Sequence, residues 1–182
     1  VEIQDVDEKL TILNDKLIIY ESNKLDKTNQ INTNDDAINM ATNFLNKLEY
    51  DTTDMKLSYI REIEGRFYLE FSKIYNEKYL ESAFTNIQLD NTGIRKFERL
   101  WLNEIEVGDT QIFISSAPKS ILGLLSMNEV YGKTIQDISL CYYFDPEKHE
   151  YIQNPLDAKQ GRAIPAWRIQ FDDGYKVFID NY

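Results

Sequence analysis

The sequence predicts an α+β protein built from two similar subdomains, each a helix packed on an antiparallel sheet. Three observations predict this class. An amphipathic helical segment is followed by several strand-like runs, the same order of elements occurs again in the second half, and short turn sequences separate the runs. We therefore expect an N-terminal hairpin and linker at 1–34, a first helix-plus-sheet subdomain at 35–106 and a second at 107–182.

The composition is that of a folded, acidic protein. The chain has 182 residues, of which 42% are hydrophobic and 13% aromatic, and this is enough for a packed core. It carries 31 acidic and 20 basic residues, which gives a net charge of −11. The densest basic segment, Ile94 to Arg99, alternates charged with apolar residues, as an exposed strand face does. We therefore expect no nucleic acid among the partners.

The first half begins with a predicted hairpin. Two apolar runs within 10–20 flank Asn14-Asp15, a pair that favours a tight turn, and a polar linker at 21–32 follows. A helix is then predicted from Asp35 to Leu48, with Asn34 or Asp35 as its cap. Its apolar stripe has a period of 3.6 residues and consists of Ala37, Met40, Ala41, Phe44, Leu45 and Leu48.

Four strands are predicted after this helix. Their ranges are Met55 to Ile63, Arg66 to Tyr75, Ala83 to Leu89 and Ile94 to Leu102, with a Glu64-Gly65 turn between the first two.

The second half repeats the order. Ser115 or Ser116 is expected to cap a helix over Ala117 to Leu125 that has Pro118 in its first turn. Ile121, Leu122 and Leu125 supply its expected apolar face. Strands are predicted at Ile135 to Phe144, Tyr151-Ile152, Ala166 to Phe171 and Tyr175 to Ile179, the last two joined by the turn Asp172-Asp173-Gly174.

The closing hairpin assigns faces to a neighbouring tryptophan and arginine. Trp167 alternates in phase with Ile169 and Phe171, so we expect it to anchor the core. Arg168 lies on the other face of the same strand. We expect it to face outward, where it either pairs with a carboxylate or contacts a partner.

The sequence contains no motif that predicts catalysis, and we expect neither a metal nor a cofactor. Cys141 lies in an apolar strand, which is typical of a buried cysteine, and His149 lies in a polar loop. These are the only cysteine and the only histidine, and their different settings predict that they do not pair for catalysis, while a single histidine excludes a His-Glu-x-x-His zinc site. Adjacent aspartates occur at a helix start and in a turn, where acidic residues are common. We expect no enzyme activity.

Tyrosines supply the candidate binding surface. The chain has 12 of them, and tyrosine gives a large contact area at a low cost in conformational entropy. The alternative is that most are half-buried residues of the sheets. The residues predicted to contact a partner are Tyr142, Tyr143, Tyr151, Arg168 and Tyr175.

The C-terminal half resembles the YycI regulatory proteins of Gram-positive bacteria. The resemblance rests on a strand ending in Tyr142-Tyr143, a variable loop, the segment Pro165-Ala-Trp-Arg-Ile169 and a terminal hairpin, preceded by the short helix SAPKSILGLLSM. It extends back to the first helix and leaves residues 1–31 unplaced. YycH and PepSY-like modules share the helix-on-sheet plan.

This resemblance implies a non-enzymatic regulatory domain outside the cell, anchored in the cell membrane by one N-terminal helix. Such a protein acts with YycH on an essential sensor histidine kinase that controls cell-wall metabolism. The chain starts at Val1 and not at Met, so we expect that an N-terminal segment precedes it. The alternative is a secreted or lipid-anchored PepSY-like or cystatin-like module that binds a peptide or a protein.

Overall fold

The protein is an α+β fold, as the sequence predicts. Its ten described strands are paired into one branched sheet, which we describe as a first and a second sheet because each part carries helical structure on one face. The computed structural model describes residues 1–25, 30–103, 107–108, 111–144 and 161–180. The predicted loop histidine His149 and the predicted strand Tyr151-Ile152 lie outside these ranges.

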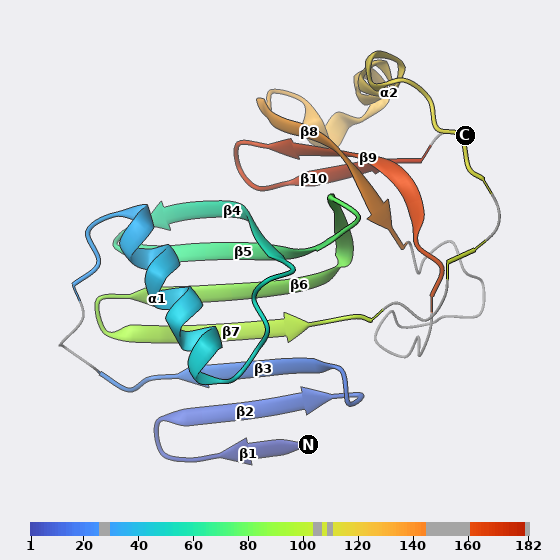
Figure 1. The fold of residues 1–182 in the computed structure, drawn as a ribbon. Coiled ribbons are helices and arrows are strands. Elements are labelled where there is room, and N and C mark those ends of the chain that lie inside the picture. Colours follow the sequence, from blue (N-terminus) through green and yellow to red (C-terminus); the bar gives the residue numbers. More distant parts are fainter. Residues whose placement is uncertain (26–29, 104–106, 109–110, 145–160, 181–182) are drawn as a thin grey trace.

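Seven strands form the first sheet, and all their pairings are antiparallel. Their spatial order is β1-β2-β3-β7-β6-β5-β4 (Figure 1). The strands are β1 (Glu2–Gln4), β2 (Glu8–Leu13), β3 (Leu17–Ser22), β4 (Met55–Ile63), β5 (Arg66–Tyr75), β6 (Lys78–Asp90) and β7 (Gly93–Leu100). The predicted bounds of β4 and β5 are confirmed.

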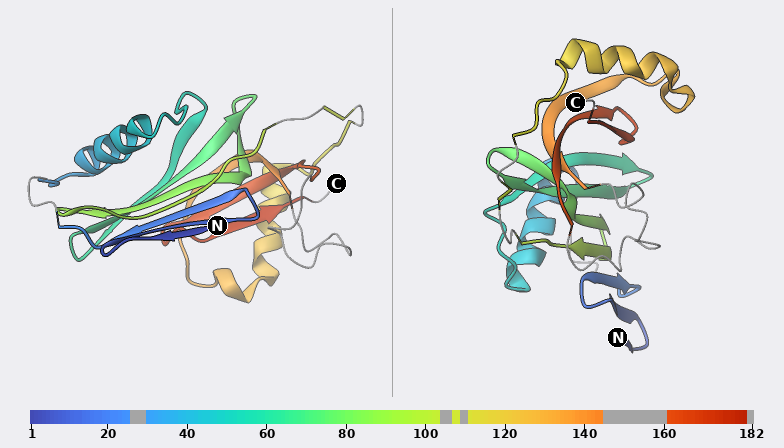
Figure 2. Two further views of the ribbon diagram at one scale, coloured as in Figure 1. Left: turned by 90° about the horizontal axis from the view of Figure 1, so that it is seen from below. Right: turned by 90° about the vertical axis from the view of Figure 1, so that its right-hand side faces the viewer.

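The second sheet consists of β8 (Ile135–Tyr143), β9 (Ile164–Phe171) and β10 (Lys176–Ile179), with β9 in the middle. It joins the first sheet through a short parallel pairing of β6 with β8, in which Tyr79 lies opposite Cys141 and Leu80 opposite Tyr142. Figure 2 shows the second sheet placed against one end of the first sheet, with the helices on opposite sides of the molecule.

The predicted hairpin turns form as expected because their residues tolerate a left-handed backbone. Asn14 and Asp15 have φ angles of 50° and 54°, and Glu64 and Gly65 have angles of 52° and 77°. Such pairs of positive φ angles match the right-handed twist of the flanking strands. The N-terminal hairpin does not stand apart, since β3 pairs with β7 and extends the first sheet.

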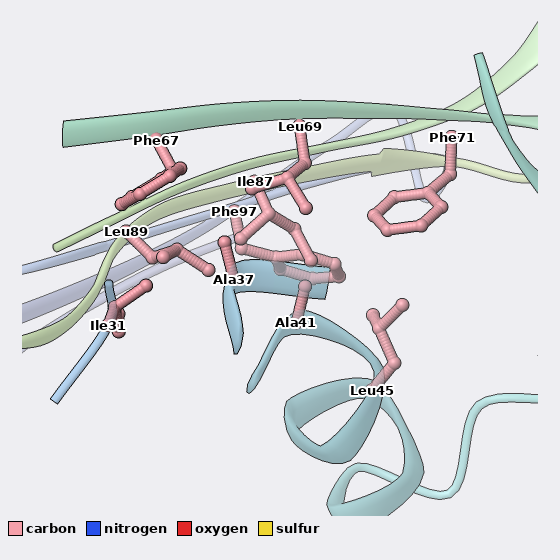
Figure 3. Packing of buried hydrophobic residues seen from close by; sticks show 10 residues of the cluster. All are labelled: Ile31, Ala37, Ala41, Leu45, Phe67, Leu69, Phe71, Ile87, Leu89 and Phe97. Atoms are coloured by element: carbon pink, nitrogen blue, oxygen red, sulfur yellow. The ribbon is translucent and has the colours of Figure 1, made fainter. Parts of the chain in front are cut away.

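Helix α1 (Asn34–Lys47) packs across the first sheet and covers the main core (Figure 3). Ala37 and Ala41 have no exposed surface, because their small side chains let the helix backbone approach the strands. Phe44 meets Phe97 of β7 edge-to-face, with 5.4 Å between ring centroids. The buried cluster contains Ile31, Ala37, Ala41, Leu45, Phe67, Leu69, Phe71, Ile87, Leu89 and Phe97.

The cap of α1 differs from the prediction. Thr33, and neither Asn34 nor Asp35, is the N-cap: its side chain accepts a hydrogen bond from the backbone N–H of Asp36 at 3.1 Å. The Asp36 carboxylate in turn accepts from the Thr33 backbone N–H at 3.0 Å, which completes a capping box. Hydrogen bonds from the Asn32 backbone and from Thr33 lower the pKa of Asp36.

The second helix buries a different face from the one predicted. Helix α2 (Ala117–Gly123) continues as the 3₁₀ turns η1 (Leu124–Ser126) and η2 (Asn128–Val130). Leu124 is buried and Ile121 packs beside it, whereas Leu122 and Leu125 are 65% and 85% exposed. The prediction that Leu122 and Leu125 pack inward is wrong. Leu122 lies on the face of α2 away from the buried Ser120 and Leu124, and the tighter 3₁₀ turn that follows Gly123 turns Leu125 outward.

We predict that Thr33→Ala lowers the free energy of unfolding by about 1 kcal/mol, because it leaves a helix N–H without its cap. Ser116→Ala is the matched control. Ser116 is the N-cap of α2 but makes no side-chain capping bond, so this change should have little effect. Urea unfolding of both variants measures the difference. Equal losses would contradict the assigned cap.

Candidate functional site

A buried arginine joins the two sheets. Arg168 of β9 is 0% exposed, and its guanidinium donates three hydrogen bonds. Nε donates to Glu81 Oε1 at 2.6 Å, one terminal nitrogen to Asp137 Oδ2 at 2.9 Å, and the other to Gln170 Oε1 at 2.5 Å. The Tyr79 ring lies against the guanidinium, 4.5 Å from its central carbon. The prediction that Arg168 faces outward is therefore wrong.

The reason is that both faces of β9 are covered. Trp167, Ile169 and Phe171 point to the helical side of the second sheet, as predicted, and there the Trp167 indole N–H donates to the Ser115 carbonyl at 2.7 Å. Arg168 points to the other side, which packs on the first sheet. Alternation along a strand separates two faces but does not show which of them meets solvent.

A bulge in β6 brings the partner carboxylate to Arg168. Ser72 of β5 lies opposite Phe84, but the next residue, Lys73, lies opposite Leu80. Residues 81–83 of β6 therefore have no partner on β5. Bulges of this kind bend a strand and redirect its side chains. Here the bulge directs Glu81 toward the second sheet, where its side chain is only 4% exposed.

A second cation completes the cluster, which we call the junction network: Arg168, Lys176, Glu70, Glu81 and Asp137. Lys176 of β10 lies 3.0 Å from Glu81 Oε2 and also pairs with Glu70 of β5. Arg168 and Glu81 are the buried pair of this network, and removing either one would leave the other charge buried with a more exposed partner, so this pair fixes the position of both side chains. The network thus holds the two sheets in one relative placement.

Cys141 lies beside this network and is buried, as predicted. Burial, together with the nearby charge of Glu81, raises the pKa of its thiol to about 12. A thiol must lose its proton to act as a nucleophile, so Cys141 is unsuited to that role at neutral pH. No group of three metal-binding side chains occurs among the described residues.

A second buried arginine lies on the α1 side of the first sheet. The Arg99 guanidinium stacks on Trp101 and Tyr50, with its central carbon 3.9 and 4.6 Å from the ring centroids. It donates to the Thr85 hydroxyl at 2.6 Å, and burial lowers its pKa. Aromatic rings therefore enclose the Arg99 charge within the fold.

The predicted tyrosines do not form one surface. Tyr142 and Tyr143 are successive residues of β8 and point to opposite faces: Tyr142 meets Tyr75 edge-to-face and Tyr143 stacks on Phe178. Tyr175 is 42% exposed, and Tyr151 lies outside the described residues. Their part in partner binding, and that of Arg168, stays a prediction.

The structure instead shows a hollow that the sequence analysis missed. It has a volume of about 200 Å³ and lies on the face of the first sheet opposite α1. Its walls are formed by strands β4 to β7, and its polar lining residues are Tyr59, Tyr68, Glu70, Asn86, Gln88 and Glu98. Polar residues alternate with buried apolar ones in β5 and β6, so the exposed face was predictable, but its concave shape was not.

The second sheet touches one wall of this hollow. The Tyr59 hydroxyl donates to the Asp172 carbonyl at 3.4 Å. The ring lies so close to the β9–β10 turn that a Cβ on Gly174, whose φ is 86°, would come within 2.8 Å of it. Glu70 belongs both to the hollow and to the junction network, so the hollow and the contact between the sheets share residues.

Two solved structures have a fold similar to that of this chain. No family model and no curated protein matches the chain. The crystal structure of YycH from Bacillus subtilis is similar with a TM-score of 0.66 and 13% identity, over 97% of this chain and 43% of that one. The C-terminal domain of Bacillus megaterium YpeB is similar with a TM-score of 0.50 and 12% identity, over 99% of this chain and 82% of that one.

This chain therefore spans less than half of the YycH structure. At these identities the likeness describes the arrangement of helices and strands. Within the described part of the chain, no helix is long and apolar enough to cross a membrane.

We predict that Gly174→Ala destabilises the protein more than Gly65→Ala. Both glycines have a positive φ, but only Gly174 also faces the Tyr59 ring, whereas the space around Gly65 is open. Backbone strain should cost about 1 kcal/mol at either site. The clash should add about 1–3 kcal/mol at Gly174. Urea unfolding measures the loss of unfolding free energy in each variant. Equal losses would show that the Tyr59 ring does not restrict the side chain at position 174.

Proposed function

We propose that this chain is the extracytoplasmic, non-enzymatic regulatory domain of a membrane-anchored protein. Together with a YycH-like protein, it modulates an essential sensor histidine kinase that controls cell-wall metabolism. The observation that carries this proposal is the likeness to YycH, which extends over 97% of the chain. The resemblance of the C-terminal sequence to YycI, a partner of YycH, supports the same assignment independently.

The chemistry of the described residues also supports a binding role. The buried charges of Arg168 and Glu81 are paired with each other in the junction network, and the one thiol keeps its proton at neutral pH. The open hollow presents tyrosine, amide and carboxylate side chains to solvent. Such groups recognise another molecule by contact and hydrogen bonding.

A rigid domain regulates a partner by binding one of its states more tightly than the other. A tenfold preference corresponds to about 1.4 kcal/mol, which a few contacts supply. The junction network serves this purpose by keeping the two sheets, and hence the binding surface, in a fixed geometry. Tyr175 of the β9–β10 hairpin stays the predicted partner contact with the most exposed side chain.

The second candidate function is a secreted or lipid-anchored module of PepSY-like or cystatin-like type that binds a peptide or a protein. The likeness to the YpeB domain favours it, because that match covers 82% of a chain consisting of one C-terminal domain. The two candidates differ in their target, and both require association with another protein.

The test is reconstitution of the full-length protein that contains this chain in vesicles with the YycH-like protein and the kinase. We predict that the full-length protein copurifies with the YycH-like protein and lowers kinase autophosphorylation. Tyr175→Ala should weaken both effects. Tyr131→Ala is the matched control, since Tyr131 is exposed but is not a predicted contact.

Failure to copurify, together with unchanged phosphorylation, would contradict the regulatory assignment. Thermal melting of the two tyrosine variants separates a loss of binding from a loss of folding.

A further inference from the structure

The first sheet has an open edge at β1. Among the described strands, β1 pairs with β2 alone, and it lies at the end of the sheet away from the second sheet (Figure 1). Val1 and Ile12 exchange two backbone hydrogen bonds, at 2.7 and 2.8 Å. Hydrogen-bonded pairs alternate along an antiparallel ladder, so the backbone N–H and C=O groups of Glu2 and Gln4 point away from β2. These groups face the open edge, where a further strand can bind them.

A row of apolar side chains crosses the first sheet and ends at this edge. Its members are direct cross-strand neighbours on the α1 face: Ile87 of β6, Phe97 of β7, Tyr20 of β3, Leu10 of β2 and Ile3 of β1. Ile87 is 0% exposed in the core under α1, whereas Ile3 is 61% exposed. Apolar cross-strand pairs stabilise a sheet, and Ile3 has such a neighbour on one side only. The row therefore favours an apolar residue on the next strand.

The other edge of the same sheet is protected in a way that β1 is not. Strand β4 has a bulge at Ser58, which has no partner on β5, and carries the exposed charges of Arg61 and Glu62. Bulges and charged side chains are the usual features that prevent an edge strand from pairing with another chain. Strand β1 pairs with β2 in regular register, and Ile3 and Val1 are exposed on its α1 face.

The sequence of β1 is complementary to a second copy of itself. Because the outward-facing groups belong to Glu2 and Gln4, a two-fold axis between two antiparallel copies passes through residue 2, 3 or 4. An axis at residue 2 sets Glu2 opposite Glu2, and like charges in that position are destabilising. An axis at residue 4 sets Ile3 opposite Asp5. An axis at residue 3 sets Ile3 opposite Ile3 and Glu2 opposite Gln4, whose amide donates to a carboxylate.

We propose that two copies of this chain pair through β1, antiparallel about Ile3, and join their first sheets into one continuous sheet. Glu2 of each copy exchanges backbone hydrogen bonds with Gln4 of the other, so the outward-facing groups of both residues find partners. The two Ile3 side chains meet on the α1 face and complete the apolar row of each copy. The inference goes beyond the proposed function and does not depend on it.

The dimer is weak and salt-dependent. Its contact is one short strand, which is less than the area that stable interfaces bury. Each copy carries a net charge of −11, so the copies repel each other at low ionic strength, and salt screens this repulsion. We therefore expect association to strengthen as salt is added.

Disulfide crosslinking tests the pairing. Ile3→Cys places two thiols in a non-hydrogen-bonded pair, in which the Cα atoms lie about 4.5 Å apart, within reach of a disulfide. Val6→Cys is the matched control, because Val6 is 92% exposed but lies about 20 Å from its counterpart in this pairing. With diamide as the oxidant, we predict a linked dimer for Ile3→Cys and little for Val6→Cys. The native Cys141 is buried and contributes no background.

Two charge variants at one position test the register. Gln4→Lys sets a positive charge opposite Glu2 of the other copy, and Gln4→Glu sets a negative charge there. We predict that Gln4→Lys lowers the Kd of the dimer roughly fivefold and that Gln4→Glu raises it by a similar factor, because each change acts twice across the two-fold axis. Sedimentation over a range of protein concentrations measures the Kd, and thermal melting checks that both variants fold.

Equal crosslinking of the two cysteine variants, equal Kd values for the two charge variants, or a native protein that stays monomeric up to millimolar concentration would overturn the inference. Crosslinking of Ile3→Cys to the YycH-like protein in preference to a second copy would also overturn it. Kinase regulation is measured separately on the full-length protein. Regulation by a protein that does not self-associate would reject this inference and leave the proposed function standing.

Discussion

The fold depends on one buried ionic contact, between Arg168 of the second sheet and Glu81 of the first. Within the described residues, backbone pairing between the sheets is a short parallel pairing of β6 with β8. Arg168 adds a side-chain constraint across this junction, because Asp137 and Gln170 of its own sheet hold its planar guanidinium while Nε donates to Glu81 of the first sheet. Glu81 is in place only because the bulge in β6 redirects it. A local irregularity in one strand thus decides how two sheets pack.

The same contact connects the fold to the proposed function. Lys176 links Glu81 to Glu70, and Glu70 forms part of the floor of the hollow. Tyr59 lines the hollow and also contacts the turn between β9 and β10. The hollow therefore adjoins the groups that hold the second sheet. A regulatory domain that binds by contact requires such a fixed surface, since its selectivity between two states of a partner depends on geometry.

The sequence predicted the bounds of helices and strands more accurately than it predicted which of their faces are buried. The α+β class, the bounds of β4 and β5 and the Asn14-Asp15 turn follow from local periodicity and turn chemistry, which are local properties. Alternation correctly placed Arg168 opposite Trp167, but the burial of that face depends on Glu81, 87 positions away along the chain, so the sequence pattern wrongly predicted that Arg168 faces outward. The hollow was missed for the same reason: its polar lining is visible as alternation in β5 and β6, but its walls combine residues of four strands that are distant in the sequence. Sequence boundaries for the two subdomains remain predictions.

A double-mutant cycle on Arg168 and Glu81 tests whether this buried pair holds the two sheets together. Arg168→Met and Glu81→Met should each lower the free energy of unfolding by about 3 kcal/mol, because each removes the nearest opposite charge of a buried group and leaves it only its second partner, Asp137 for Arg168 and Lys176 for Glu81. The double variant should lose much less than the sum of the two, with a coupling of about 2 kcal/mol or more, since it buries neither charge. Urea unfolding of the four proteins gives this coupling. Losses that add within about 0.5 kcal/mol would show that the two residues act independently, and would contradict the account.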